Sequence, residues 1–413
     1  MNIFAVIILS ALVGEYILDL VSGVLNLRTL NAPLPAEFEG FASPEAYRKS
    51  QEYTRVRTKF GFVTSAWGLL LVTGFWFAGG FNRLDEFVRG LELHPVWSGL
   101  CYIGILGLAR GILGLPFSLY STFVIEERFG FNKTTPATYA ADLLKGLVLA
   151  VLLGGPLLAG VIALFQYAGS PAWLYAWIAV SVYTLVVQFV APRWIMPIFN
   201  KFTPLDPGEL RETILSLARS ADFSLENVYV MDGSRRSSKT NAFFTGFGKH
   251  KRIALFDTLV ERHTIPELVS VLAHEIGHYK RKHIIKGMLM SIAHAGILLY
   301  LMSVFIHMRG LFDAFSMESM SVYAGLVFFG MLYNPIEVVL SIFFHLISRK
   351  HEFEADRFAA DVTRQPEAMV TALKKLSIDN LSHLTPHPVH VFLNYSHPPV
   401  LERIRALREK PAR

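Results

Sequence analysis

The sequence predicts a mainly α-helical protein that crosses a membrane seven times and carries a soluble portion with a small β-sheet. Hydrophobic residues make up 52% of the 413 residues and charged residues only 17%, a balance typical of multispanning membrane proteins. Seven apolar segments are each long enough to cross a bilayer. The longest polar connection between them, residues 192–283, contains both helical and strand patterns.

The seven apolar segments group along the chain as two, three and two. They cover Ile3–Leu25, Phe60–Gly80, Val96–Leu115, Leu143–Phe165, Ala172–Ala191, Ile284–His307 and Ser321–Ile347. The first has no basic stretch ahead of it, so we expect a retained span and not a cleaved signal peptide. Cys101 is the single cysteine, so no intrachain disulfide can form.

Lysine and arginine are distributed unevenly between the two sides of the predicted membrane. The connections 26–59, 117–142 and 192–283 and the tail 348–413 share one side and hold 33 of the 39 basic residues. The positive-inside rule places that side in the cytosol. Because the basic residues cluster beside apolar segments, the net charge of +6 does not indicate nucleic acid binding. The membrane would be that of the endoplasmic reticulum in a eukaryote, and the inner or plasma membrane in a bacterium.

These boundaries divide the chain into four parts. We expect five spans with cytosolic loops in 1–191, a large cytosolic loop in 192–283, two more spans in 284–347 and cytosolic C-terminal helices in 348–413.

Several predicted spans contain charged residues, namely Glu15, Asp19, Arg110 and Glu337. Charges at that depth are costly, so they should face the bundle interior or water. Two interpretations remain open. The charges form internal ion pairs that fix helix packing, or they line a polar chamber.

The loop 192–283 is predicted to contain a helix, three strands and a second helix. The first four elements are Glu209–Asp222, Val228–Met231, Thr240–Phe247 and Arg252–Phe256, the last two forming a hairpin around Gly246 and Gly248. Pro266 then begins a helix, which we expect to continue through Lys280–Lys282 into the sixth span. The tail 365–413 is predicted to form two helices linked by Leu384–Pro398.

The helix after Pro266 contains His274, Glu275 and His278. Residues four apart share one face of a helix, so the two histidines can bind one metal ion and Glu275 can reach a water on it. This is the HExxH pattern of zinc peptidases. The plain alternative is an exposed helix on which these residues have no special role.

A catalytic zinc site needs a third protein ligand. Glu352 is the leading candidate, and Asp356, one turn further on, can accept a hydrogen bond from a ligating histidine. Glu354 points to another face of the same helix and is the second candidate ligand.

Three stretches together resemble the type I CAAX prenyl protease family of integral-membrane zinc metalloproteases: His274–His278, Glu352–Asp356 and Ser396–Pro399. Further matches are Glu127–Lys133, Phe199–Pro204 and Asn241–Gly246. The matches follow the family's order over most of the chain, whereas the segment 26–59 matches less well.

The resemblance implies a barrel of seven transmembrane helices around a water-filled chamber, with the metal site closing its cytosolic end. It implies one Zn²⁺ per chain, held by His274, His278 and Glu352, with Glu275 as the general base. It also implies that Asn241 and Ala242 form an edge strand that binds the peptide substrate, and that His397 and Arg403 stabilise the oxyanion. An ordinary hairpin, a surface turn and a solvated arginine are the alternatives for these last four residues.

The sequence therefore predicts a membrane zinc endopeptidase that cleaves peptides or proteins at the cytosolic face of the bilayer. The resemblance implies C-terminal processing of prenylated CAAX proteins. A quality-control protease for misfolded or stalled membrane proteins is the alternative within this class. A metal or solute transporter is the alternative from another class, but a transport site does not require Glu275 between the histidines. A catalytically inactive scaffold is disfavoured, because no expected catalytic residue is missing.

Overall fold

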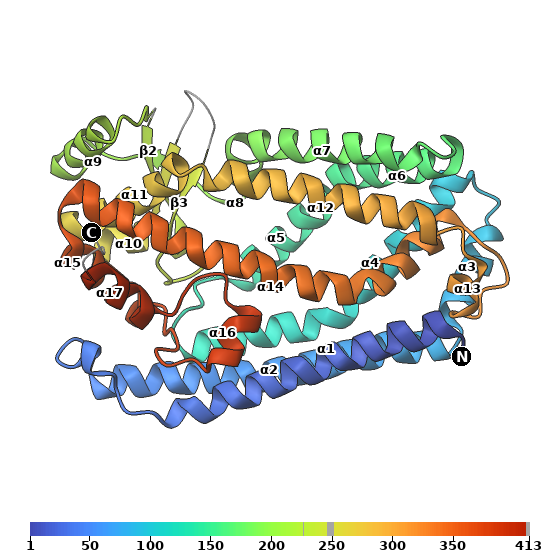
Figure 1. Cartoon of the computed structure of the whole chain (residues 1–413), viewed down its shortest axis with the longest axis horizontal. Coiled ribbons are helices and arrows are strands. Elements are labelled where there is room, and N and C mark those ends of the chain that lie inside the picture. The colour runs from blue at the N-terminus through green and yellow to red at the C-terminus, as the bar shows by residue number, and fades with distance from the viewer. Residues whose placement is uncertain (226, 246–251, 410–413) are drawn as a thin grey trace.

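The computed structural model describes residues 1–225, 227–245 and 252–409, and it places long helices side by side with a small sheet at one end (Figure 1). Within these residues, seven helices are long and apolar enough to cross a membrane, as expected. They cover Ile3–Asn31, Pro44–Phe77, Pro95–Glu126, Pro136–Tyr167, Ala172–Phe199, His283–Phe305 and Val322–Thr363.

The membrane-spanning part consists of helices that are in places joined by single turns of π-helix. The helices are α1 (Ile3–Arg28), α2 (Pro44–Phe77), α3 (Gly80–Arg89), α4 (Pro95–Tyr120), α5 (Pro136–Leu149), α6 (Gly155–Tyr167), α7 (Ala172–Val190), α8 (Met196–Phe199), α12 (His283–Phe305), α13 (Arg309–Asp313) and α14 (Val322–Thr363). The π-turns are Ser121–Glu126, Ala150–Gly154 and Ala191–Ile195. Short 3-10 turns occupy Thr29–Asn31, Ala36–Phe38 and Gly233–Arg235.

Two helices extend well beyond the apolar segments from which they were predicted. Helix α2 begins at Pro44, where the Ser43 hydroxyl accepts a hydrogen bond from the Ala46 N–H at 3.1 Å. Helix α14 continues without a break past the seventh apolar segment to Thr363. Hydropathy detects only the part of a helix that lies in lipid, so it did not show that the helix of Glu352 and Asp356 is continuous with the seventh span. Glu352 therefore lies on the polar extension of the helix that forms the seventh span.

The soluble elements form a four-stranded sheet surrounded by short helices. They are β1 (Phe202–Pro204), α9 (Glu209–Ser220), β2 (Asn227–Met231), β3 (Ala242–Thr245), β4 (Arg252–Phe256), α10 (Asp257–Arg262), α11 (Ile265–Lys280), α15 (Pro366–Asp379), α16 (Pro388–Asn394) and α17 (Val400–Arg408). The strand order is β1-β2-β4-β3, with β2 and β4 parallel and the other pairs antiparallel.

Strand β1 and helix α16 were not expected from the sequence. Strand β1 ends in Pro204 and lies at one end of the sheet order, where proline is tolerated. Helix α16 lies inside the predicted linker Leu384–Pro398, starting at Pro388. The hairpin of β3 and β4 is confirmed, but its predicted turn around Gly246 and Gly248 falls outside the described residues.

Helix α11 is the centre of the soluble core. Its apolar side chains, including Leu272 and Ile276, are fully buried against Ile253 and Leu255 of β4 and against Ala359 of α14. Burial of this kind contributes roughly 1.5–3 kcal/mol for each large side chain. The packing therefore fixes α11 between the sheet and the end of the seventh span.

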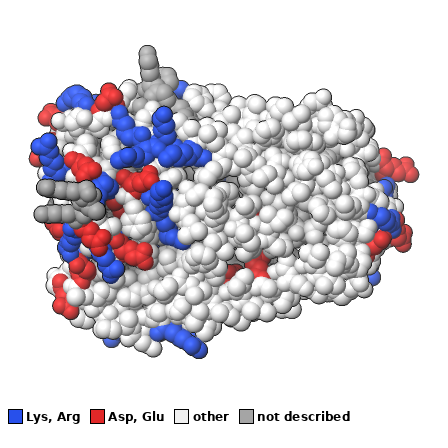
Figure 2. Space-filling view, viewed as in Figure 1, with Lys and Arg blue, Asp and Glu red and all other residues white. Residues whose placement is uncertain are grey.

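Charged side chains are concentrated at one end of the molecule. Figure 2 shows Lys, Arg, Asp and Glu gathered over the end that contains α9, α15 and α17, then a broad band almost free of charge, and a few charges at the opposite end. A band of this kind is expected where lipid surrounds the helices. Two acidic residues predicted to lie within the spans have partners on other helices. Glu15 accepts a hydrogen bond from Asn334, and Glu337 lies 3.1 Å from the His294 Nε2.

Candidate metal and catalytic site

The helix that carries the two motif histidines begins at a well-defined cap. Thr264 and Glu267 form a capping box, and Pro266 lies in the first turn. The Glu267 carboxylate also accepts a hydrogen bond from the Lys375 ammonium of α15 at 2.7 Å. Both the start of α11 and its packing are therefore fixed before the chain reaches the histidines.

Three predicted ligands converge between α11 and α14. His274 Nε2 lies 3.0 Å from His278 Nε2, and the Glu352 carboxylate lies 3.5 Å from the first nitrogen and 3.2 Å from the second. One ligand atom from each residue lies within 4.8 Å of the other two. Both His274 and Glu352 are buried.

This geometry fits a single tetrahedral cation. With metal–ligand bonds of about 2.0–2.1 Å, ligand atoms around tetrahedral zinc are roughly 3.3 Å apart, close to the three separations observed. In addition, the buried Oε2 of Glu352 has no hydrogen-bond partner among the described residues. Its nearest cationic neighbour, Arg403 Nη1, lies 3.4 Å away. A buried carboxylate oxygen that makes no hydrogen bond is costly, and a metal cation bound to it would reduce that cost.

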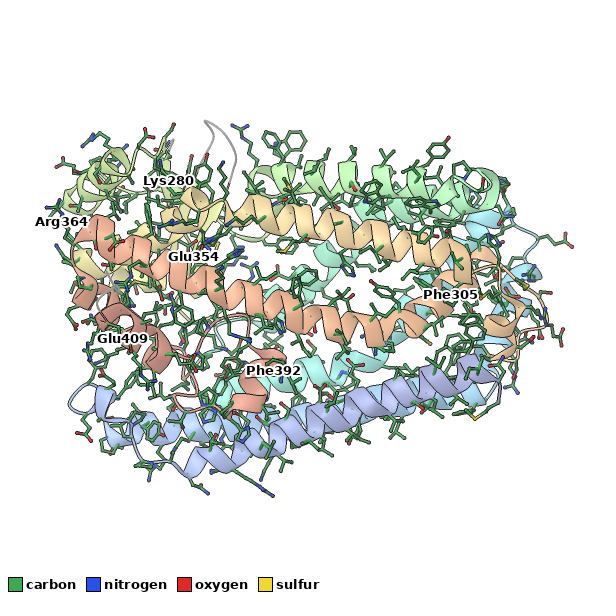
Figure 3. The ribbon with its side chains drawn as sticks, in the orientation of Figure 1. Lys280, Phe305, Glu354, Arg364, Phe392 and Glu409 are labelled. Carbon is green, nitrogen blue, oxygen red and sulfur yellow. The ribbon has the colours of Figure 1, made fainter. Side chains whose placement is uncertain are left out.

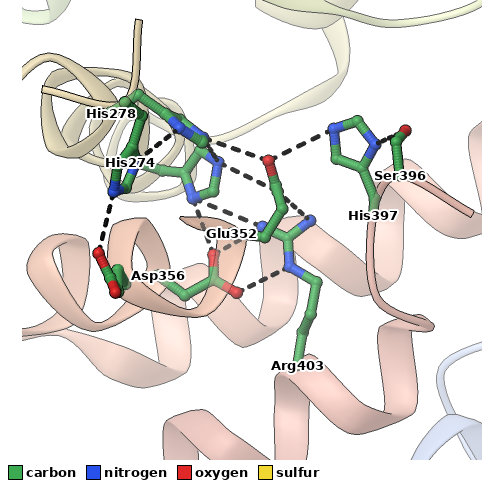
Figure 4. A network of polar contacts seen from close by, with 9 residues as sticks. His274, His278, Glu352, Asp356, Ser396, His397 and Arg403 are labelled. Carbon is green, nitrogen blue, oxygen red and sulfur yellow. Dashed lines mark hydrogen bonds and ion pairs between the residues drawn. The ribbon is translucent and has the colours of Figure 1, made fainter. Parts of the chain in front are cut away.

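Asp356, which is paired with Arg403, contacts the ring nitrogen of His274 that does not face the other two candidate ligands. The Nδ1 of His274 lies 2.8 Å from Asp356 Oδ1, and Arg403 donates to both oxygens of Asp356 at 2.7 and 2.6 Å (Figure 4). Burial alone would lower the pKa of His274. The hydrogen bonds with Asp356 and Glu352 outweigh it and raise the pKa to about 9 in the metal-free protein. With Nε2 facing the other ligands, Nδ1 is the nitrogen that donates to Asp356.

Gly277 allows α11 to lie unusually close to α14. A Cβ atom on Gly277 would lie 3.1 Å from the Cα and 3.2 Å from the carbonyl oxygen of Ala355. These are backbone atoms that cannot rotate away. The small residue therefore allows the histidines to reach Glu352 on the opposite helix.

The prediction that this helix continues into the sixth span was wrong. Helix α11 ends at Lys280, Lys282 adopts a left-handed conformation with φ 59°, and α12 begins at His283. The segment Lys280–Lys282 contains no glycine or proline, the residues that usually signal a break, so the break could not be predicted from residue types.

Glu275 lies on α11 beside the three converging residues and is half-buried. Burial raises the pKa of its carboxyl group. A carboxylate with a raised pKa, next to the place where a metal and water would lie, is suited to taking up and releasing a proton.

His397 lies on the far side of Glu352 from the two histidines of α11 (Figure 4). Its Nε2 is 3.4 Å from Glu352 Oε1, its Nδ1 is 3.0 Å from the Ser396 hydroxyl, and its side chain is 65% exposed. The Nη1 of Arg403 is 3.4 Å from Glu352 Oε2. The Arg403 side chain is only 12% exposed and is paired with Asp356, so it is not the solvated arginine of the alternative interpretation.

Asn241 and Ala242 lie at the start of β3, which is an outer strand in the sheet order. The Asn241 carbonyl accepts a hydrogen bond from the Phe256 N–H at 3.0 Å. Strand β3 packs on the metal-site helix, because the rings of Phe244 and Tyr279 lie 5.7 Å apart. An extended peptide added to this edge would therefore run beside α11.

Comparisons with known proteins identify the family of the chain. Residues 24–201 match the family model described as CAAX prenyl protease N-terminal, five membrane helices, and residues 204–410 match peptidase family M48. The chain belongs to peptidase family M48. It is therefore a metallopeptidase with multiple membrane-spanning helices, which favours the peptidase interpretation over the transporter.

Family M48 relatives resemble the chain over most of its length. The CAAX prenyl protease 1 homolog of Oryza sativa subsp. japonica is 36% identical, over 97% of this chain and 96% of the relative. CAAX prenyl protease 1 of Saccharomyces cerevisiae is 34% identical, over 91% and 88%. The crystal structure of S. mikatae Ste24p superposes with a TM-score of 0.94 at 31% identity, over 99% of this chain and 100% of that one.

Proposed function

We propose that this metallopeptidase is a zinc enzyme that cleaves prenylated CAAX proteins near their C terminus, at the cytosolic face of the membrane. The observation that carries the proposal is the convergence of His274, His278 and Glu352 beside Glu275. The printed names of the relatives, CAAX prenyl protease 1 and its homologues, support the substrate class.

The ligand set favours zinc as the metal. Two imidazoles and one carboxylate with space for a fourth ligand form the usual donor set of catalytic zinc in peptidases. When bound, the metal supplies a Lewis acid that polarises the scissile carbonyl and acidifies water.

The protein's own side chains would transfer the proton and stabilise the oxyanion. Glu275 takes a proton from the attacking water and delivers it to the leaving amine. His397, with its exposed ring beside Glu352, donates a hydrogen bond to the developing oxyanion. For Arg403, Nε and Nη2 donate to Asp356 and Nη1 lies 3.4 Å from Glu352 Oε2, so we assign the oxyanion contact to the second N–H of Nη1.

The substrate would bind in an extended conformation along the outer edge of β3 at Asn241 and Ala242. Because β3 packs against α11, this edge delivers a peptide bond toward the metal site. The interior of the helix bundle, with its polar groups Glu15 and Glu337, would form the water-filled chamber through which the substrate passes.

The decisive experiment is cleavage of a farnesylated CAAX peptide by the purified protein in detergent, beside an unprenylated peptide of the same sequence. Glu275→Gln should keep zinc and lose activity by at least about 10²-fold, the lower range for a missing proton-transfer group. Zinc content is measured on the same samples.

Each outcome bears on a different part of the proposal. Cleavage of the farnesylated peptide alone supports the substrate class, whereas equal cleavage of both peptides contradicts a requirement for the lipid. Zinc without cleavage of either peptide would direct the search to unfolded membrane proteins. Substantial activity of Glu275→Gln would remove the base assignment.

A further inference from the structure

His283 lies at the metal site although no part of the proposed reaction uses it. Its ring is buried, and both of its nitrogens have partners. Its Nδ1 lies 3.1 Å from the Nδ1 of His278, and its Nε2 lies 3.0 Å from the Glu354 carboxylate. Figure 3 places Glu354 on α14, beside the junction of α11 and α12.

We infer that His283 and Glu354 hold His278 in its metal-binding orientation, as a carboxylate–histidine–histidine relay that matches the direct support of His274 by Asp356. The inference rests on the proposed metal site, in which His278 binds through Nε2. Glu354 was the second candidate ligand from the sequence, but it is not one of the three converging residues. The inference gives Glu354 a different role, as the partner of His283.

The hydrogen positions are consistent along the whole chain of contacts. If His278 offers Nε2 to the metal, its Nδ1 carries the hydrogen and must donate. The Nδ1 of His283 must then accept, so the hydrogen of His283 lies on Nε2. That nitrogen donates to the Glu354 carboxylate. Each contact therefore has one donor and one acceptor, and both imidazoles are neutral.

The break between α11 and α12 makes this contact possible. In a continuous helix, residues five apart are separated by about 140° around the axis, so His283 would point away from His278. The left-handed residue Lys282 redirects the chain, and His283 at the start of α12 turns back toward His278. A non-glycine residue with positive φ costs about 1–3 kcal/mol and is often found next to functional sites.

Helix α14 presents two faces to the site. Glu352 and Asp356 are one turn apart and face α11, whereas His351 and Glu354 form a second face toward the start of α12. His351 stacks on His283, with ring centroids 3.9 Å apart and planes 10° apart. His351 therefore packs against the relay without being a hydrogen-bonding member of it, and it provides a matched control.

The test is the zinc dissociation constant of the purified full-length protein, measured by chelator competition. His283→Ala should weaken zinc binding about 10- to 100-fold, the usual effect of losing a partner of a ligating histidine. His283→Gln, which keeps an acceptor and a donor, should recover part of the loss. His351→Phe keeps the stacked ring and should stay within about twofold of the parent protein, whereas Glu352→Ala marks full loss of a ligand.

Two further measurements separate a positioning role from a structural one. The absorption spectrum of bound Co²⁺ reports ligand geometry and should change in His283→Ala but not in His351→Phe. Thermal unfolding of the metal-free proteins measures separately the stability that His283→Ala loses with its buried ring, so zinc affinity and the Co²⁺ spectrum are compared at a temperature where both variants are folded. Should His283→Ala fail to fold, His283→Gln and Glu354→Gln provide the same comparison.

Glu354 should act only through His283. Glu354→Ala should weaken zinc binding in the parent protein and have no further effect in His283→Ala, because the two residues act as one unit. Additive effects would overturn the relay. Unchanged zinc affinity in His283→Ala would overturn this inference alone, while a parent protein that binds no zinc would overturn the proposed function with it.

Discussion

At the scale of single residues, the candidate site consists of buried polar groups that support one another. Arg403 and Asp356 show this most clearly, since the guanidinium donates to both oxygens of a carboxylate that also contacts His274. Removing one member of a buried ion pair usually costs about 3–5 kcal/mol, because the other charge is left without a partner. The Asp356–Arg403 pair therefore holds His274 in a fixed orientation.

Glu267 gives a prediction about pH and stability. Burial raises the pKa of Glu267, but hydrogen bonds from Lys375 and the Thr264 N–H outweigh it, and the folded pKa lies below 4.5. A lowered folded pKa means that the contribution to stability is complete above the unfolded pKa and is lost as pH falls through the folded value. Glu267→Gln should therefore cost about 1–2 kcal/mol at pH 7, and the difference from the parent should shrink as pH falls from 5 to 3.

Thermal unfolding in detergent across this pH range measures the effect. Glu261→Gln is the matched control, because Glu261 is an exposed glutamate of the neighbouring helix α10 and its change should have little effect at any pH. A destabilisation by Glu267→Gln that is as large at pH 3 as at pH 7 would show that charge is not the cause.

The sequence indicated the candidate ligands and the neighbour Asp356, but not the contact between His278 and His283. Catalytic zinc restricts the residue types and spacing of its ligands, so His274, His278 and Glu352 could be proposed from the pattern alone. The neighbours of a ligand face no such restriction. The His283 contact depends on the left-handed conformation of Lys282, and no residue type in that segment reveals it. The site roles and the division of the chain into four parts remain predictions.

At the scale of elements, the approach of α11 to α14 sets the distance between the two halves of the metal site. Gly277→Ala would place a Cβ atom 3.1 Å from the Ala355 backbone, and the helices would have to separate by a few tenths of an ångström. We expect a loss of about 1–3 kcal/mol from overpacking, despite the higher helix propensity of alanine, together with weaker zinc binding.

Gly287→Ala on α12 is the matched control, because a Cβ atom there would meet nothing within 4 Å. It should gain up to about 1 kcal/mol from helix propensity and leave zinc affinity unchanged. Thermal unfolding and chelator competition measure the two effects. Equal behaviour of the two alanine variants would contradict a requirement for close approach at Gly277.

The elements also show where the sequence was sufficient. The length of the apolar segments identified the seven spans, because lipid surrounds them. The alternation of apolar and polar residues identified the β3–β4 hairpin, because one face of a strand is buried in the core. Strand β1 and helix α16 were missed because both are short, at three and seven residues, and lie in segments rich in proline or histidine. Their stability comes from packing on neighbours, which periodicity does not record.

At the scale of the whole molecule, the distribution of charge suggests which side of the membrane carries the metal site. The end with the sheet and the tail helices contains most of the charged side chains (Figure 2). The connections between spans at that end contain most of the lysine and arginine residues. The connections at the opposite end contain only Arg83, Arg89 and Arg309. By the positive-inside rule, this asymmetry supports the proposed cytosolic position of the metal site.

The single cysteine allows this orientation to be tested by labelling. In a Cys101→Ser background, Ser216→Cys adds an exposed thiol on α9, and Ser319→Cys adds one between α13 and α14 at the opposite end. In sealed vesicles with the cytosolic face outward, a membrane-impermeant maleimide should label Ser216→Cys at once and Ser319→Cys only after detergent. Cys101→Ser alone should stay unlabelled in both conditions.

The reverse pattern would place the metal site on the other side of the membrane and remove the cytosolic part of the proposed function. It would leave the geometry around His274 unchanged, because that geometry does not depend on which compartment the site faces.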